Sequence, residues 1–300
     1  MTRAAEQVRE LRAAPVDSTT FLWSEVDDPE TECIIEVSEP DMDTVPQSGN
    51  KLVRRRYKSG REPIYPYTGI ALEKWGQYGD YNSSAPQGVS IGCPAMAVGM
   101  LLYDVCNRID GINQETSPYF DYTDMYYRNA KSVSKRMRQI ADGMIDYHWG
   151  TVSGGSGIDM IVVELALQQL GFKNAKLEKF SLSKAYENMC MKGTDYFGKE
   201  QTFHRGILLE GRQKSAAGGS VRHVWFCDGY YEREIKVTTI KRRLFKKKKT
   251  VRYEYEDVLY MNWGLENSSN GWYAFWEEHA VNGKYTDDPR MITGLNYFKR

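Results

Sequence analysis

Cysteine and histidine are both scarce in this sequence. Its 300 residues include five cysteines and four histidines. No two cysteines form a CxxC pair, so neither a zinc knuckle nor a thioredoxin-like redox motif is expected. The odd number of cysteines argues against a disulfide framework and leaves at least one thiol free.

Net charge and long apolar runs are also missing. Forty Lys and Arg residues balance forty Asp and Glu residues, so no overall field favours nucleic acid or an anionic membrane as a partner. No stretch reaches the ~20 apolar residues of a membrane span. The first residues, "MTRAAEQVRELRAAPVD", lack the apolar core of a signal peptide. We therefore expect a soluble chain, whose compartment these features leave open.

The charge pattern changes near residue 60. Residues 1–50 are polar and acidic, whereas "KLVRRRYKSGR" at 51–61 is basic. Such a change favours a domain boundary. We expect residues 1–60 to be a pro-segment, a peripheral strand or a linker.

The character of the chain changes again near residue 200. Apolar residues recur at helical spacing from Cys93 to about Val105, and further helices fit 133–147, 157–170 and "LSKAYENMCMKG". Beyond residue 200, β-branched and aromatic segments alternate with turn residues. Helices followed by strands predict an α+β fold with two lobes.

Seven Lys or Arg residues lie within 241–250. Basic residues interleaved with aromatic ones are typical of nucleic-acid binding. The alternative is a solvated hairpin whose lysines discourage edge-to-edge strand pairing. The absence of net charge and the neighbouring acids Glu254, Glu256 and Asp257 favour the hairpin.

Two segments hold a candidate nucleophile and base. In "SIGCPAMAVGMLLYDV", Cys93 lies between a glycine and Pro94 at the start of a predicted helix, where the helix dipole and free N–H groups favour a thiolate. A thiol nucleophile needs a base, usually an imidazole. His223 in the strand-like "SVRHVWFCDGYY" supplies one, ahead of the turn pair Asp228-Gly229. Taken alone, each of these residues is more often explained by core packing.

Two further side chains complete the arrangement. Asn262, at a strand end beside Trp263, is placed to accept the second imidazole N–H while the indole shields that bond from water. Gln77, sixteen residues before Cys93, is placed to form an oxyanion hole together with the Cys93 backbone N–H.

The order Gln77, Cys93, His223, Asn262-Trp263 resembles that of papain-like cysteine peptidases, and the local words resemble the bacterial streptopain family. The resemblance covers about residues 72–277. The segments that carry it are "KWGQYGDYN", "IGCPAMAVGMLLYD", "MIDYHWGTVSGGSG", "RHVWFCDGYY" and "YMNWGLENSSNGWYAF".

The resemblance implies a papain-like catalytic domain over 61–300, with a helical lobe of about 90–195, a β lobe of about 200–300 and a cleft between them. It implies Cys93 as nucleophile, His223 as general base and acid, Gln77 in the oxyanion hole, and Asn262 and Trp263 as supports of His223. It also implies that Ser153, Gly154 and Gly155 lie along the cleft and offer backbone groups to an extended peptide.

The chain departs from the family pattern at three places. Arg222 replaces a glycine before the histidine, and either narrows the cleft or selects acidic substrate side chains. Leu265-Glu266-Asn267 replaces a second tryptophan motif. The long basic hairpin between Asp228 and Asn262 is an exosite or a spacer. Residues 1–60 are also too short for the family's complete pro-domain, so they are expected to be its remnant or an N-terminal arm.

The resemblance predicts a cysteine endopeptidase that cleaves proteins or peptides through a Cys–His thioester, without a metal or organic cofactor. It predicts a protein that is secreted or held at the bacterial surface or periplasm, with its own pro-segment as a further partner. The zero net charge and the lack of a heptad pattern favour a monomer without a nucleic-acid partner. Two alternatives stay open: an occluded or silent scaffold that binds proteins, and an acyl transferase or transamidase that uses the same Cys–His pair.

Overall fold

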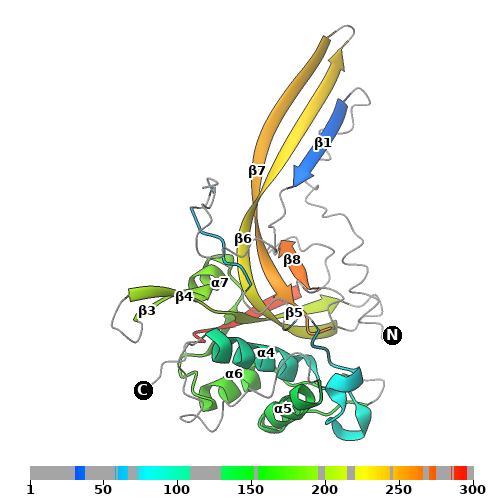
Figure 1. The fold of residues 1–300 in the computed structure, drawn as a ribbon. Coiled ribbons are helices and arrows are strands. Elements are labelled where there is room, and N and C mark those ends of the chain that lie inside the picture. Colours follow the sequence, from blue (N-terminus) through cyan, green and yellow to red (C-terminus); the bar gives the residue numbers. More distant parts are fainter. Residues whose placement is uncertain are drawn as a thin grey trace.

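One antiparallel sheet organises the part of the chain that the computed structural model describes (Figure 1). The described residues are 31–37, 58, 60–66, 72, 74–108, 130–151, 155–194, 200–214, 220–243, 246–265, 270–274, 285 and 287–295. Helices precede most of the strands. The structure is therefore mixed α+β, as predicted.

The main sheet contains seven strands. Their order is β2 (Lys176–Lys179), β9 (Asp287–Thr293), β5 (Ile207–Lys214), β6 (Ser220–Arg243), β7 (Lys246–Asn262) and β8 (Gly271–Ala274), and β1 (Thr31–Val37) pairs with β6 off this path. All of these pairs are antiparallel. A separate two-stranded sheet joins β3 (Cys190–Thr194) to β4 (Glu200–His204).

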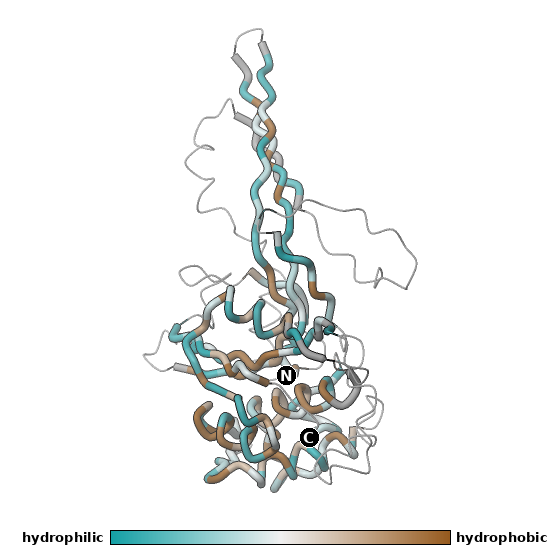
Figure 2. The backbone as a smooth tube through the Cα atoms, turned by 90° about the vertical axis from the view of Figure 1, so that its left-hand side faces the viewer, coloured by the Kyte–Doolittle hydropathy of each residue, from teal (hydrophilic) through white to brown (hydrophobic). Residues whose placement is uncertain are grey.

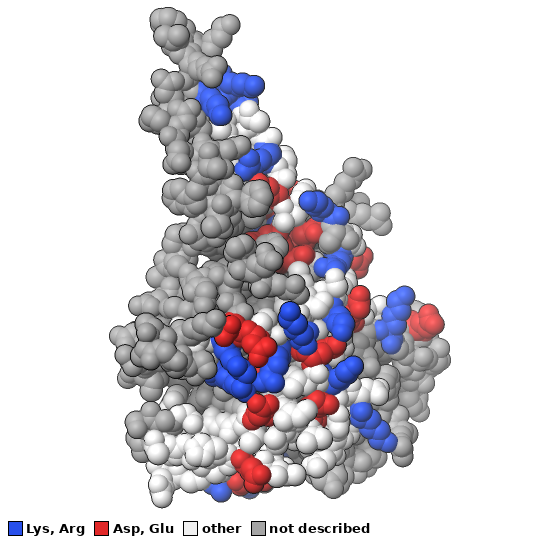
Figure 3. Space-filling model, turned by 180° about the vertical axis from the view of Figure 1, so that it is seen from behind, with Lys and Arg blue, Asp and Glu red and all other residues white. Residues whose placement is uncertain are grey.

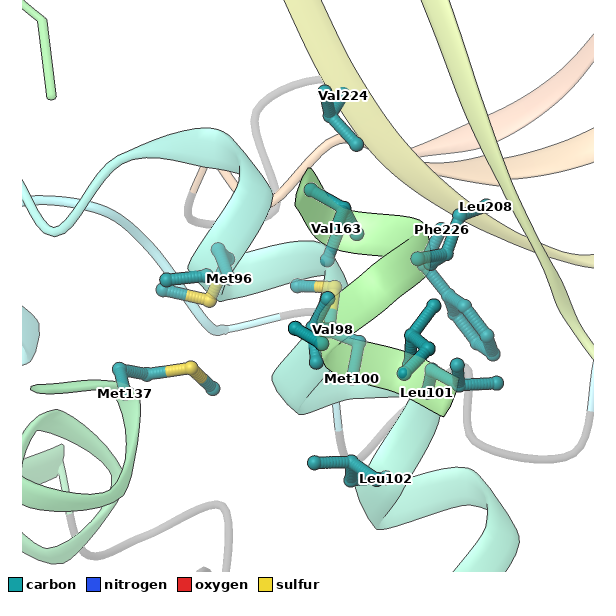
Figure 4. Close-up of a cluster of buried hydrophobic side chains, with 14 of the residues drawn as sticks. Met96, Val98, Met100, Leu101, Leu102, Met137, Val163, Leu208, Val224 and Phe226 are labelled. Atoms are coloured by element: carbon teal, nitrogen blue, oxygen red, sulfur yellow. The ribbon is translucent and has the colours of Figure 1, made fainter. Parts of the chain in front are cut away.

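Side chains of the central strands alternate between two hydrophobic cores. Leu208, Val224 and Phe226 face α4 (Cys93–Arg108), as Figure 4 shows. Leu209 and Trp225, one residue away along the same strands, belong to the core on the opposite face, together with residues of α7 (Leu182–Met189). This alternation is the two-residue period of a strand buried on both faces.

The helix α4 is buried over most of its length, and it fixes the position of its first residue, Cys93. Val98, Leu101 and Leu102 have no exposed surface. The helices α5 (Ala130–Asp142) and α6 (Met160–Gln169) join the same core through Met137 and Val163 (Figure 4). Single turns of 3₁₀ helix, η2 (Gly79–Asn82) and η3 (Pro86–Gly88), precede α4.

The predicted helices are confirmed, with corrections at their ends. The helix predicted for 133–147 begins three residues earlier and ends at Asp142, before Gly143. The helix predicted for 157–170 begins after Asp159, whose side chain accepts a hydrogen bond from the Ile161 N–H at 3.1 Å. The helix predicted through "MCMKG" ends at Met189 because the next residues pair as β3 with β4.

The strands β6 and β7 form a long hairpin that projects from the helices and the rest of the sheet (Figure 1). We call its projecting part, Glu232–Arg243 paired with Lys246–Asp257, the arm. Figure 2 shows that the arm is mainly hydrophilic, whereas hydrophobic residues concentrate around the helices. The predicted solvated hairpin is therefore present, and its strands run well beyond the basic segment.

The predicted turn at Asp228-Gly229 is wrong. The strand β6 continues through these residues with a shift of register between Cys227 and Gly229. The irregularity absorbs an extra residue without ending the strand. A Cβ added at Gly229 would lie 2.6 Å from the Tyr260 Cβ, so the glycine serves a close approach of strands instead of a turn.

Of the N-terminal segment 1–60, the structure describes only β1, Lys58 and Gly60. The strand β1 pairs with the arm from Thr31 opposite Lys241 to Val37 opposite Ile235. A peripheral strand, one of the three forms expected for this segment, is therefore present. The division at residue 60 stays a prediction.

Candidate active site

Gly92 and Cys93 mark the point where the chain enters α4. The Gly92 carbonyl accepts a hydrogen bond from the Met96 N–H at 3.2 Å, which begins the helix. Gly92 has φ of +91°, and an added Cβ would lie 2.2 Å from the Tyr147 hydroxyl and 2.6 Å from the Ser156 carbonyl oxygen. Only glycine fits this position, both for its backbone angle and for its lack of a side chain.

The hydroxyl of Tyr147 fixes the backbone just before Cys93. It donates a hydrogen bond to the Ile91 carbonyl oxygen at 2.6 Å, and its ring meets Trp149 edge to face, with centroids 5.2 Å apart. Burial raises the pKa of Tyr147, and the neighbouring Cys93 raises it further. Tyr147 therefore stays a neutral donor beside the thiol.

The sulfur of Cys93 faces the strand that carries His223. Burial raises the pKa of the Cys93 thiol to about 11, against the opposing effect of hydrogen bonds from the backbone N–H groups of Val224 and of Cys93 itself. Val224 directly follows His223 in β6, so Cys93 lies against the backbone of the strand that carries His223. Pairing of the two side chains stays a prediction. The expected lowering of the thiol pKa by the helix N-terminus is not found, because desolvation outweighs it although Cys93 is only partly buried.

His223 is enclosed by aromatic rings. Trp263 and Trp225 stack on it with centroids 5.7 and 6.1 Å away, and Tyr285 lies at 5.5 Å. Only 8% of the His223 surface is exposed. Burial lowers the pKa of the imidazole to about 4, although the Trp263 carbonyl partly opposes the shift. His223 is therefore neutral at pH 7.

The hydrogen bond of His223 defines its tautomer. Nε2 lies 3.0 Å from the Trp263 carbonyl oxygen. A carbonyl only accepts, so Nε2 carries the proton, and in a neutral ring Nδ1 then has the free lone pair. The imidazole is thus held as a base at Nδ1.

The acceptor for His223 is a backbone group instead of the predicted Asn262 amide. The Asn262 side-chain oxygen accepts from the Gly264 N–H at 3.3 Å. The Trp263 N–H in turn donates to the Asn270 side chain at 2.9 Å. Asn262 therefore shapes the turn that presents the Trp263 carbonyl, because its amide is used within that turn.

Gln77 is buried and lies on the segment that links α4 to this turn. Its backbone carbonyl accepts from the Ile91 N–H at 3.2 Å. The preceding residue, Gly76, forms an antiparallel bridge with Leu265. The backbone of Gln77 is thus connected both to the residues before Cys93 and to those after Trp263. The role of the Gln77 side chain in an oxyanion hole stays a prediction.

The predicted substrate loop is described only in part. Ser153 and Gly154 lie outside the described residues, whereas Gly155 is exposed, with open space where a side chain would begin. The Ser156 N–H donates to the Ser90 hydroxyl at 3.2 Å, close to Gly92. The end of this loop is therefore anchored beside the entrance to α4.

Arg222 forms ion pairs on the face of β6 that looks away from the His223 ring. Its guanidinium lies 2.6 Å from the Asp159 carboxylate and 3.8 Å from Glu210. Arg290 bonds the same two acids, with Nε 2.6 Å from Glu210. Two cations thus balance two anions, and Arg222 adds no unbalanced positive charge.

Burial sets the protonation tendencies of this cluster. It raises the pKa of Glu210 despite the two arginines. Burial acts in the same direction on Asp159, but the Ile161 N–H and Arg222 outweigh it and lower that pKa. Asp159, the acid that caps α6, is therefore more readily ionised than Glu210. Its ion pair with Arg222 attaches α6 to β6.

Two residues of the site were not predicted from the sequence. Tyr147 lies within the segment "MIDYHWGTVSGGSG", where nothing local marks it, and Tyr285 belongs to no motif. Burial, followed by the neighbouring Cys93, raises the pKa of Tyr285 to about 12. The sequence holds no strong signal for either tyrosine. The chain contains 21 tyrosines, so an aromatic residue by itself does not mark a site.

The described residues contain no group of three or more His, Cys, Asp or Glu side chains that could hold a metal ion. Their helices include none that is long and apolar enough to cross a membrane.

Comparison with known proteins identifies a fold. No protein-family model and no curated sequence matches the chain. Its structure is similar to that of the active wild-type interpain A cysteine protease of Prevotella intermedia. The TM-score is 0.52 at 16% sequence identity, over 81% of this chain and 97% of that chain. The chain therefore shares the α+β fold of a cysteine protease.

Proposed function

We propose that this chain is a cysteine endopeptidase of the streptopain type. The observation that carries the proposal is the contact between the Cys93 sulfur and the backbone N–H of Val224, the residue after His223. This contact supports Cys93 as nucleophile and His223 as base, although the two residues are 130 positions apart in the sequence. The fold, which is similar to that of a cysteine protease, supports the same assignment. Thiol acyl transfer requires a thiol beside an oriented imidazole, and the proposal pairs the Cys93 sulfur with the His223 ring in this way.

The proposed reaction starts from a neutral pair. The Cys93 proton passes to Nδ1 of His223 as the sulfur attacks the peptide carbonyl carbon, and the Trp263 carbonyl steadies the imidazolium through Nε2–H. The backbone N–H of Cys93 and the Gln77 amide stabilise the oxyanion. His223 returns its proton to the leaving amine. A water molecule, deprotonated by His223, then hydrolyses the thioester.

The resting protonation follows from burial. A thiol pKa of about 11 and an imidazole pKa of about 4 keep the proton on sulfur. His223 therefore acts as a general base in the attack, and a stored thiolate–imidazolium pair is not part of the proposal. An imidazole that is held in place by a hydrogen bond suits general-base removal of the thiol proton.

Arg222 has a structural part in the proposal. Of the two roles expected for it, the ion pairs with Asp159 and Glu210 support the steric one. A guanidinium balanced by two carboxylates is a poor receptor for an acidic substrate side chain. We propose that Arg222 narrows the substrate cleft, with Gly155 on the loop opposite.

The same proposal includes the two-lobe arrangement, the catalytic domain 61–300 and a pro-segment within 1–60. Secretion is part of it too and rests on the sequence resemblance. A monomeric state is also included, because zero net charge and the lack of a heptad pattern give no reason to propose an oligomer. A second candidate, an occluded binding scaffold, is favoured by one observation, the near-complete burial of His223.

Labelling of the nucleophile tests the proposal. The protein is incubated with a peptidyl epoxide, and its intact mass is measured beside Cys93→Ala and Cys190→Ala variants. Cys190 is a matched control because it is also a free, partly exposed thiol whose pKa is raised by burial. We expect one adduct on the parent and on Cys190→Ala, and none on Cys93→Ala.

The contrary results are equally definite. A folded, reduced parent that forms no adduct would favour the occluded scaffold. An adduct that persists in Cys93→Ala would reject Cys93 as the nucleophile. If labelling occurs, product analysis with added amines separates hydrolysis from acyl transfer.

A further inference from the structure

The outer end of the arm concentrates positive charge on paired strands. Three consecutive cross-strand pairs are like-charged: Lys241 with Lys248, Arg242 with Lys247, and Arg243 with Lys246. Figure 3 shows blue residues toward the end of the arm, and red and blue residues intermixed nearer the helices. Like charges directly opposite each other destabilise a hairpin. An anionic partner at this end would remove that penalty.

The acids of the arm are too distant to be that partner. They lie near its base and comprise Glu232, Glu234, Glu254, Glu256 and Asp257. Glu234 and Lys241 lie seven positions apart along β6, roughly 23 Å at the usual rise. The Debye length at physiological salt is only about 8 Å. The acids of the arm itself therefore do not offset the positive charge at its outer end.

The strand β1 brings another set of acids to the same place. Its first residue, Thr31, pairs with Lys241 at the basic end. Further along, the Glu36 carboxylate lies 2.5 Å from Lys236 Nζ. The hydrogen bond from Lys236 lowers the pKa of Glu36, and Lys249 of the opposite strand adds to the effect.

The sequence just before β1 is strongly acidic. Residues 24–30 read "SEVDDPE", with acids at Glu25, Asp27, Asp28 and Glu30, and Glu32 follows within the strand. Because the two strands are antiparallel, Thr31, the first residue of β1, lies at the lysine-rich end. Charge complementarity and strand register thus identify the same segment.

We propose that the basic end of the arm is a docking surface for an acidic extended segment, and that residues 24–37 of this chain are its occupant. The strand part adds an edge to β6 through main-chain hydrogen bonds. The acids supply charge selectivity, and the buried Ile235 and Val237 of the arm supply an apolar contact beside β1. This inference does not depend on the peptidase activity.

The docking affinity can be measured with a chain that has been cleaved between the segment and the arm. A site for a specific protease is inserted between Pro46 and Gln47 of the full-length Cys93→Ala protein, and the chain is cleaved there. The affinity of the N-terminal fragment for the remainder is then measured by fluorescence anisotropy at low and high salt. We expect the dissociation constant to rise about tenfold or more between about 50 and 500 mM NaCl, as screening removes exposed ion pairs.

Variants separate charge from strand pairing. Replacement of Lys241, Lys247, Lys248 and Lys249 by Gln is expected to weaken fragment binding by about tenfold, the combined effect of several exposed ion pairs. The same loss is expected from E25Q/D27N/D28N/E30Q. The matched control is K131Q/K135Q on α5, which removes exposed lysines elsewhere and leaves binding unchanged.

A charge exchange makes the test independent of any loss of folding. The combination K247E/K248E/K249E with E25K/D27K/D28K should bind its own fragment as tightly as the parent does, while each half alone fails. Equal binding by all variants at both salt concentrations would overturn the proposal. So would tip variants that lose binding to anionic lipid vesicles or duplex DNA yet hold the fragment with parental affinity.

Discussion

The strand β6 joins two regions that differ in the burial and pairing of their charged groups. Near His223 the ionisable groups are buried, neutral or paired, as with Arg222 and its two acids. At the far end of the same strand, like charges face one another in the open. Burial makes the first region sensitive to protons, and exposure makes the second sensitive to salt. One strand thus serves two electrostatic regimes.

The largest expected difference between the regions is catalytic. Cys93→Ala or His223→Ala should lower peptide turnover by about 10⁴-fold or more, since a nucleophile and its base act as a unit. An arm shortened by joining Ile235 to Glu254 through Asn-Gly should keep turnover within about twofold, because Asn-Gly closes a tight hairpin. Turnover of a fluorogenic peptide measures both. Equal losses in the two kinds of variant would contradict the separation.

The second prediction concerns Gln77. Gln77→Ala should lower kcat by about 10²–10³-fold, the usual effect of removing one oxyanion donor. Its backbone bond to Ile91 is retained, so thermal unfolding should change little. Gln77→Glu serves as the isosteric control and should be equally slow. A rise of KM with unchanged kcat would place Gln77 in substrate binding only.

The third prediction is a pH dependence of stability. Burial lowers the pKa of His223 from an ordinary 6.5 to about 4, so between these values the unfolded chain binds a proton that the folded state does not. Stability should therefore fall as pH falls from about 6.5 to 4, by on the order of 3 kcal/mol. Urea unfolding at several pH values measures this slope. His223→Gln should flatten it, whereas the lysine-to-glutamine tip variant should leave it unchanged.

The fourth prediction tests the packing at the start of α4. Gly92→Ala should destabilise the fold by about 2 kcal/mol or more, because of its positive φ and the nearby Tyr147 hydroxyl and Ser156 carbonyl. Gly155→Ala, in open space, should stay within about 0.5 kcal/mol of the parent. Chemical denaturation compares them. Similar stabilities would mean that the Gly92 position can relax.

The smallest expected effect lies at the end of the arm. Lys248→Glu converts its pairing with Lys241 from like to opposite charge. In the cleaved chain from which the N-terminal fragment has been removed, the melting temperature should rise slightly at low salt, as expected for an exposed cross-strand pair, and the gain should vanish at high salt. A gain that persists at high salt would require a cause other than charge.

Local signals explain what the sequence revealed of the site. Gly92 and Pro94 mark a helix start whatever the rest of the chain does, and the apolar spacing after Cys93 predicts its burial. His223 gained meaning only from its order relative to Cys93 and Asn262. The α+β class followed from the same local patterns, since helical and strand periods differ.

Contacts made by the backbone left no such signal. The Trp263 carbonyl holds His223, and a carbonyl is present at every residue, so the sequence pointed to the Asn262 amide instead. Tyr285 reaches the site through tertiary packing and lies near no motif. Asp228-Gly229 is a typical turn pair whose glycine is required here by Tyr260. In each case a distant neighbour decided the outcome.

The regular pairing of the arm has an evolutionary consequence. From Gly229 opposite Tyr260 to Arg243 opposite Lys246, each residue of β6 has one partner on β7. Loss or gain of one residue in both strands would therefore change the reach of the tip by about 3.3 Å without disturbing the register at His223. Changes of two residues per strand would also keep every side chain on its original face. The reach of the arm can drift between lineages while the chemistry at its root stays fixed.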